Sequence, residues 1–211
     1  MSSPKDLYIA GAGGLGRELL AWLRQSPDCG RVWEPKGYLD DDPEARGRDL
    51  PLPLVGSVDG FSPGPDSMVV LGLGNSEPRE DVVEKLDARG VDFLTFVHPS
   101  VNIGERVTIG RGTVICPGCV LTCDISVGEF CFFNLKVTVG HDVSLDSFVS
   151  ISSQVDLCGG VVVEDGVWFG SGARVIPCKR IRKKARVGAG AVVIRDVPAG
   201  ITVFGNPAKR I

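Results

Sequence analysis

A histidine followed directly by an aspartate, His141-Asp142, is the best candidate for acid–base chemistry in this chain of 211 residues. An imidazole titrates near neutrality and can accept a proton, while a neighbouring carboxylate can orient the ring and stabilise the imidazolium. His141 is one of only two histidines and occupies an outward position between Val139 and Val143. The pair predicts a general base, and the alternative is a surface histidine beside a solvated turn aspartate.

A second candidate site is the glycine-rich loop at residues 11–16, which joins a predicted strand, 6–10, to a predicted helix, 17–24. Without side chains, such a loop lets backbone N–H groups and the helix N-terminus approach an anion, so it suits a phosphate. A dinucleotide site is the alternative. However, only about 95 residues precede the second half of the chain, too few for a complete six-stranded dinucleotide fold.

The elements that must position this loop alternate between strand and helix. Strands are predicted at 6–10, 32–39, 67–73 and 91–97, and helices at 17–24 and 81–89. The alternation predicts a small Rossmann-like βαβαβ domain with a parallel sheet over residues 1–97, with 40–65 as a loop. The second histidine, His98, is predicted to be a turn residue at the boundary.

The second half of the chain repeats with a period of six. Large apolar residues recur at every sixth position from Val97 to Val193. A second period-six series lies two positions before them, and its members are small or β-branched, with Lys179 as the one exception. A helix cannot keep this period on one face, whereas short strands joined by tight corners can, with both series pointing inward. The repeat predicts a solenoid of triangular coils over residues 98–211, with Cys119 and Cys131 as compact core residues.

Composition narrows the class of partner. Twenty-three Lys and Arg against 26 Asp and Glu give a net charge of −3, which does not favour nucleic acid. No apolar run reaches the ~18 residues that span a bilayer, and no signal peptide is apparent, so we expect a cytoplasmic protein without a membrane partner. Seven cysteines without paired spacing predict neither a disulfide framework nor a metal site.

These motifs together resemble a known family. The hexads resemble the left-handed β-helix (hexapeptide-repeat) acyltransferases, which are trimers that use acetyl-CoA or another acyl-CoA, and the predicted handedness comes from this resemblance. With its N-terminal half, the chain resembles the bacterial nucleotide-sugar acetyltransferases of surface-glycan synthesis, including the bacillosamine and perosamine N-acetyltransferases, and the related sialic acid O-acetyltransferases. The motifs that carry the likeness are the glycine loop and residues 38–41, 71–75, 98–100, 133–134, 141–142, 196–200 and 203–209.

The resemblance implies roles for particular residues. Acyl transfer from a thioester requires the acceptor to lose a proton, so the catalytic set is His141 as general base, Asp142 as its partner and Asn134 to position acceptor or coenzyme. The implied substrate-binding residues, around the glycine loop and the acidic pair, are Gly11, Gly13, Gly14, Leu15, Asp40, Asp41, Gly74 and Asn75. The expected CoA-binding residues are Ser150, where some relatives place a histidine near the thioester, Gly159, Gly172 and Ala173, along whose backbone the pantetheine arm is expected to lie, and Lys209 and Arg210, which suit its phosphates. The basic run 179–184 is either a further contact for the coenzyme's phosphates or a solvated face.

The expected activity follows from this set. We expect an acetyl-CoA-dependent N-acetyltransferase acting on the amino group of a nucleotide-linked amino sugar. The alternatives are O-acetylation of a sialic acid or another sugar hydroxyl, and a non-catalytic nucleotide-sugar-binding trimer. We expect a homotrimer with sites between neighbouring prisms, because a single prism face is too flat to enclose CoA. Two departures from the family are Leu15 and Ser150, each at a position where relatives carry a histidine.

Overall fold

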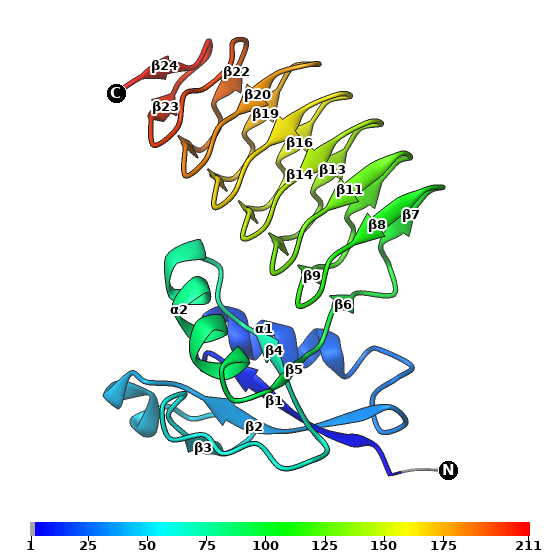
Figure 1. Cartoon of the computed structure of the whole chain (residues 1–211), viewed down its shortest axis with the longest axis vertical. Coiled ribbons are helices and arrows are strands. Elements are labelled where there is room, and N and C mark those ends of the chain that lie inside the picture. The colour runs from blue at the N-terminus through cyan, green and yellow to red at the C-terminus, as the bar shows by residue number, and fades with distance from the viewer. Residues whose placement is uncertain (1–2) are drawn as a thin grey trace. The chain divides into compact units, whose positions relative to one another are not determined.

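A parallel sheet forms the first of two compact units, which separate between Pro99 and Ser100 in a computed structural model that describes residues 3–211 (Figure 1). Its elements are β1 (Lys5–Ala10), α1 (Gly14–Leu23), β2 (Trp33–Leu39), the 3-10 helix η1 (Pro43–Gly47), β3 (Leu54–Gly56), β4 (Ser67–Leu71), α2 (Ser76–Asp87), β5 (Asp92–Phe93) and β6 (Phe96–Val97). Five strands pair in the order β3-β2-β1-β4-β5, all of them parallel. The predicted α/β class is therefore confirmed.

Two elements of this unit differ from their predicted form. Helix α2 begins at Ser76 rather than at residue 81, because Pro78 lies in the first turn, where no intrahelical partner exists for the N–H that proline lacks. The predicted loop 40–65 contains η1 and the short strand β3, which pairs with β2 through Tyr38 and Leu54. The flanking prolines obscured this strand in the sequence, and its place at the sheet edge tolerates them.

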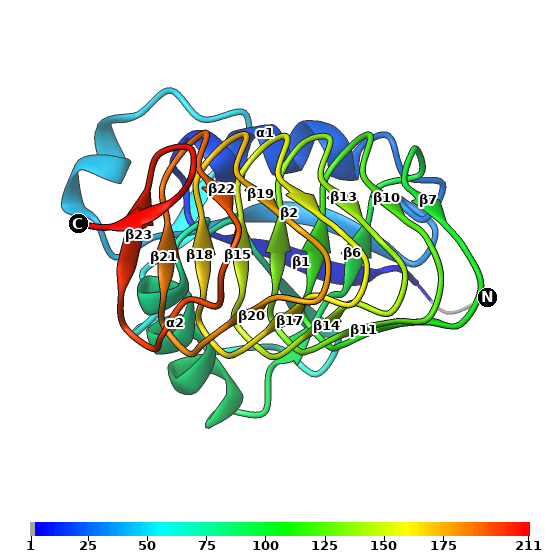
Figure 2. The ribbon, with the colours of Figure 1, turned by 90° about the horizontal axis from the view of Figure 1, so that it is seen from above.

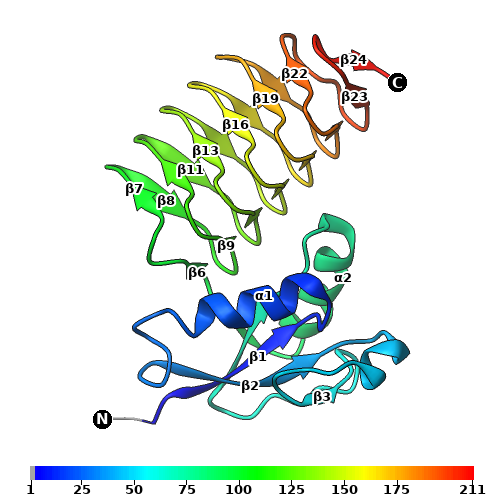
Figure 3. The same cartoon turned by 180° about the vertical axis from the view of Figure 1, so that it is seen from behind.

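The second unit is a three-sided prism of stacked two- and three-residue strands (Figures 2 and 3). Its first face contains β7 (Asn102–Ile103), β10 (Val120–Leu121), β13 (Thr138–Val139), β16 (Asp156–Leu157), β19 (Arg174–Val175) and β22 (Val192–Val193). Its second contains β8 (Val107–Ile109), β11 (Ile125–Val127), β14 (Ser144–Leu145), β17 (Val162–Val163) and β20 (Arg180–Ile181). Its third contains β9 (Val114–Ile115), β12 (Phe132–Phe133), β15 (Ser150–Ile151), β18 (Trp168–Phe169), β21 (Arg186–Val187), β23 (Thr202–Phe204) and β24 (Lys209–Arg210).

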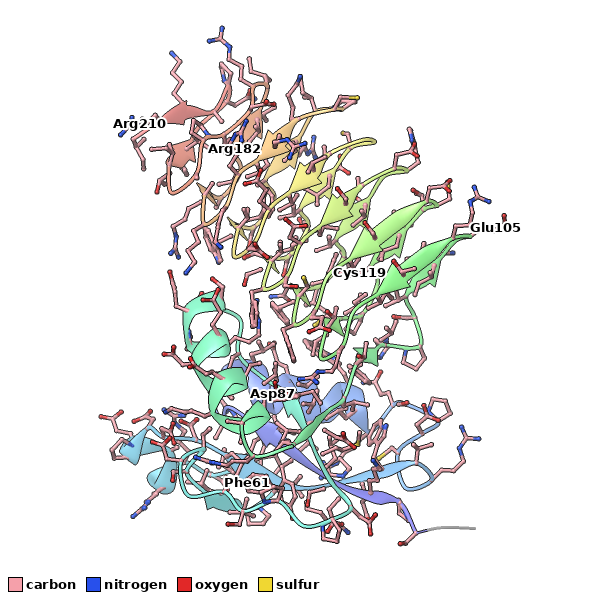
Figure 4. The ribbon with its side chains drawn as sticks, viewed as in Figure 1. Phe61, Asp87, Glu105, Cys119, Arg182 and Arg210 are labelled. Atoms are coloured by element: carbon pink, nitrogen blue, oxygen red, sulfur yellow. The ribbon has the colours of Figure 1, made fainter. Side chains whose placement is uncertain are left out.

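Each coil of this prism takes 18 residues. Phe132 pairs in parallel with Ser150, and Ser150 with Trp168, so three hexads complete one coil. The period-six apolar series points inward, as Phe133 and Phe169 show with 0% exposure, and the fold is the expected left-handed parallel β-helix. Cys119 lies in the same interior (Figure 4), and burial raises the pKa of its thiol to about 11, which fits the predicted core role.

The first coil of the prism is less buried than the coils that follow it. Ile103, in the first coil, is 40% exposed because only one coil covers it. No helix within residues 3–211 is long and apolar enough to cross a membrane.

His98 is buried, which corrects its prediction as a turn residue. Only 6% of the residue is exposed, and its Nε2 lies 3.1 Å from the side-chain oxygen of Gln25. Burial disfavours the imidazolium and lowers the pKa of His98 below 6.5.

This burial predicts a pH dependence of folding. The unfolded chain binds a proton at His98 near pH 6.5 that the folded chain refuses, so stability is fully present above that pH and decreases below it, until the lowered folded pKa is reached. His98→Gln removes the titration and should flatten this part of the profile. Urea unfolding of both proteins at about pH 8 and about pH 5.5 measures it. Equal losses in the two proteins would contradict the assignment.

Candidate active site

His141 and Asp142 lie at one edge of the prism, in the turn between β13 and β14. We call the six turns stacked along this edge, residues 104–106, 122–124, 140–142, 158–160, 176–178 and 194–196, the His141 corner. The Nδ1–H of His141 donates to Oδ2 of Asp142 at 2.7 Å, and the two side chains are 68% and 66% exposed. Asp142 has φ +60, a left-handed conformation that aspartate tolerates. With Nδ1 protonated and bound to Asp142, Nε2 of the neutral ring carries the lone pair that can accept a proton.

Gly159 lies one coil after His141, directly against the ring. A Cβ built at Gly159 would lie 2.6 Å from both Cε1 and Nε2 of the imidazole. The two residues are 18 positions apart, and the N–H of Gly160 donates to the backbone oxygen of His141 at 2.8 Å. Gly159 was predicted among the CoA contacts, and the structure places it beside the candidate base.

The two coils before His141 each add one charged residue that the sequence did not single out. Arg106 forms a two-pronged ion pair with Asp124, in which Nη2 lies 2.7 Å from Oδ2. This guanidinium holds the pKa of Asp124 below its usual value. The 18-residue coil was the available signal, since Arg106, Asp124 and Asp142 are 18 apart.

Asn134 does not join His141 within one chain. It follows β12 and lies at a different prism edge, which we call the Asn134 corner (residues 116–118, 134–136, 152–154, 170–172 and 188–190). Its Oδ1 accepts a hydrogen bond from the Leu135 N–H at 2.8 Å, so the side-chain oxygen of Asn134 stabilises the turn in which Asn134 itself lies. Gly172 lies at this same corner with φ +71.

Two predicted CoA contacts lie away from the His141 corner. Ala173 is 0% exposed because it belongs to the inward series, so it cannot touch a ligand outside the prism. Ser150 is 1% exposed on β15, on the third face. The period-six pattern already put Ala173 in the inward series, whereas Ser150 was predicted from the position of a histidine in relatives and belongs to neither inward series.

A cavity of ≈ 490 Å³ lies at the C-terminal end of the His141 corner. It lies in the last coil and includes Arg195, Asp196, Lys209 and Arg210, so the predicted phosphate contacts Lys209 and Arg210 share one cavity. Arg182 and Arg210 are at this end of the prism in Figure 4, and every charged residue of 174–211 except Asp196 is basic. Within the run 179–184, Arg180 lies 3.4 Å from Glu164 and Lys183 lies 3.8 Å from Asp165.

The glycine loop of the first unit lies where three parallel strands end. Ala10 is in register with Leu39 of β2 and with Leu71 of β4, so the segments after these strands share one sheet edge. A Cβ at Gly16 would overlap the carbonyl oxygen of Gly11, which means that only glycine lets α1 approach β1 this closely. Gly13, the N-cap of α1, offers no side-chain cap, so the helix N-terminus is available to an anion.

Asp40 and Asp41 bind backbone at this edge. Asp40 accepts hydrogen bonds from the N–H of Ala12 at 2.7 Å and of Asp42 at 2.9 Å, and Asp41 accepts one from Val58 at 2.7 Å. Asp40 therefore fixes the glycine loop, a positioning role that the sequence did not separate from direct ligand contact.

Two cavities open at the same edge. One of ≈ 160 Å³ brings Gly11, Asp40 and Asp41 together with Leu73, and one of ≈ 820 Å³ extends from Asp40 along residues 40–57. Arg79, which sequence reasoning missed, is 1% exposed and donates to the carbonyl of Leu73 at 2.8 Å. It thereby holds the turn that contains Gly74 and Asn75, beside these cavities.

The comparisons with known proteins agree along the whole chain, although no family model matches it. The chain is 32% identical over 217 residues to GDP-perosamine N-acetyltransferase from Escherichia coli O157:H7, covering 98% of this chain and 96% of that protein. The acetyltransferase domain of PglB from Neisseria gonorrhoeae in complex with acetyl coenzyme A matches with a TM-score of 0.84 and 29% identity, over 99% of this chain and 100% of the other. PerB from Caulobacter crescentus in complex with CoA and GDP-perosamine matches with a TM-score of 0.84 and 28% identity, over 100% of both chains. The chain belongs to the hexapeptide-repeat, left-handed β-helix family of nucleotide-sugar acetyltransferases.

Proposed function

We propose that this protein transfers an acetyl group from acetyl-CoA to the amino group of a nucleotide-linked amino sugar, with His141 as general base. The observation that carries the proposal is the exposed imidazole whose Nδ1 is bound by Asp142, so that Nε2 is the ring nitrogen that can accept a proton. The relatives support the acceptor class, because the E. coli enzyme is a GDP-perosamine N-acetyltransferase and the PerB complex contains CoA and GDP-perosamine.

The reaction needs one proton acceptor and no covalent enzyme intermediate. The neutral amine of the sugar attacks the thioester carbonyl carbon, and the N–C bond forms as Nε2 of His141 takes a proton from the amine. The carbon–sulfur bond then breaks, and the proton passes to the departing thiolate to give free CoA. Asp142 keeps Nδ1 protonated and stabilises the transient imidazolium.

The oxygen that becomes negative during attack needs a donor. Gly159 packs against His141, and its N–H donates to no acceptor among residues 3–211. A fixed backbone N–H beside the base is suited to the developing oxyanion. In this assignment, Gly159 keeps a contact with the acyl group while its α-carbon faces the imidazole.

The donor is proposed to follow the His141 corner toward the end of the prism. The register β13-β16-β19-β22 puts the turn of Arg195 three coils beyond that of His141, about 14 Å away at ~4.8 Å per coil. The cavity there, with Lys209 and Arg210, is suited to the phosphates of acetyl-CoA, because cations and a concave surface occur together.

The separation of the two corners supports a homotrimer with shared sites. His141 and Gly159 belong to one edge of the prism, whereas Asn134 and Gly172 belong to another. If the predicted homotrimer forms, the His141 corner of one protomer meets the Asn134 corner of the next. The nucleotide sugar is assigned to the first unit, where the uncapped N-terminus of α1 is suited to its diphosphate.

A thiol-release assay tests this proposal. The protein is incubated with acetyl-CoA and GDP-, UDP- and TDP-linked 4-amino sugars, with matched 4-hydroxy nucleotide sugars and free sialic acid as controls, and free CoA is followed with a thiol reagent. We expect release only with an amino acceptor. Release with hydroxyl acceptors alone would replace N-acetylation by O-acetylation, and no release with any acceptor would overturn the enzymatic assignment within this panel.

A further inference from the structure

Gly159 and the imidazole of His141 occupy the same small space at the His141 corner. The ring atoms Cε1 and Nε2 lie 2.6 Å, and Cδ2 lies 3.1 Å, from the position that a Cβ at residue 159 would take. The backbone of Gly159 is outside the left-handed region, so nothing in its own conformation requires glycine. The imidazole is therefore the group that would have to move if residue 159 carried a side chain.

The ring is restrained on two sides in this arrangement. Asp142 binds Nδ1 at 2.7 Å, and Gly159, which has no side chain, lies next to the side of the ring that carries Nε2. Because His141 is 68% exposed, few other contacts limit its rotation. A ring free to rotate would lose both the bond to Asp142 and the direction of Nε2.

We infer that Gly159 is a positioning residue for His141, which acts by leaving the space in which the imidazole is held toward Asp142. This inference rests on the proposed role of His141 as base and adds to it a steric requirement one coil away. It differs from the prediction that Gly159 binds CoA, because a contact between Gly159 and the pantetheine arm does not depend on the imidazole.

The test is a double-mutant cycle of Gly159→Ala and His141→Ala. Gly159→Ala alone should lower kcat by about 10²-fold, the scale expected for a misplaced catalytic group, with the KM for acetyl-CoA changed little. In the His141→Ala background, which is the matched control, the same substitution should cause no further loss, since the added methyl group then meets no ring. A crystal structure of Gly159→Ala should show the imidazole turned away from Asp142.

The outcomes separate the inference from the proposed function. Normal turnover in His141→Ala would overturn the base assignment, and with it the role of Gly159. A strong loss in His141→Ala combined with normal turnover in Gly159→Ala would overturn the positioning role alone. An equal rise in the KM for acetyl-CoA in both backgrounds, with an unmoved ring, would show that Gly159 serves CoA and not His141.

Discussion

His141→Ala should lower kcat by about 10²-fold or more, because the attacking amine loses the group proposed to accept its proton. Folding should be unaffected, since the side chain is 68% exposed and its hydrogen bond is with the adjacent Asp142. Steady-state kinetics with acetyl-CoA and the amino-sugar acceptor measures the loss, and the thermal unfolding midpoint confirms that the fold is intact.

Glu105→Ala is the matched control for this substitution. Glu105 lies at the same His141 corner, two coils earlier, with its side chain 87% exposed (Figure 4). It should leave kcat unchanged, so a loss specific to His141 cannot be a general effect of altering the corner. Turnover of His141→Ala within a few-fold of the unmodified protein would exclude the imidazole as base.

Gly16→Ala disrupts the first unit and weakens nucleotide-sugar binding. The new Cβ would overlap the carbonyl oxygen of Gly11. No side-chain rotation can relieve this clash, because the carbonyl group of Gly11 belongs to the backbone. We expect a loss of at least about 1–3 kcal/mol of unfolding free energy, together with displacement of the loop that faces the diphosphate. Urea unfolding and calorimetric titration with the nucleotide sugar measure the two effects.

Gly14→Ala separates this steric effect from loss of a glycine as such. A Cβ at Gly14 has nothing within 4 Å, and in α1 an alanine is the better helix former, so stability should hold or rise slightly. Binding of acetyl-CoA, assigned to the prism, should be retained by Gly16→Ala. If Gly16→Ala unfolds at the same urea concentration as Gly14→Ala, the close approach of α1 to β1 does not matter for stability.

The solenoid was predictable because its signal is strict. An unbroken period of six from Val97 to Val193 allows only short strands with tight corners, and the buried side chains of Phe133 and Phe169 follow directly. The interior position of Ala173 followed from the same period, and so did the stacking of Gly159 on His141 once a coil is known to take 18 residues. These two results were within reach of the sequence.

Other parts of the site depend on contacts that no spacing encodes. Asp40 was identified as a site residue, but its bond to the Ala12 N–H requires the registered ends of β1 and β2. Arg79 sits in an ordinary helical pattern, and only the turn at Leu73 gives it a partner. The burial of His98 likewise comes from Gln25, 73 residues away.

The stacked coils also set the distance between the two ends of the site proposed for the acyl donor. Between the turn of His141 and the cavity at Arg195 there are three coils of identical rise, each joined only to its neighbours. In the proposed placement of acetyl-CoA, the distance between the thioester and the phosphates therefore corresponds to a whole number of 18-residue coils. Inserting or removing one coil would change this distance by about 4.8 Å, so in this architecture the distance changes in steps and not continuously.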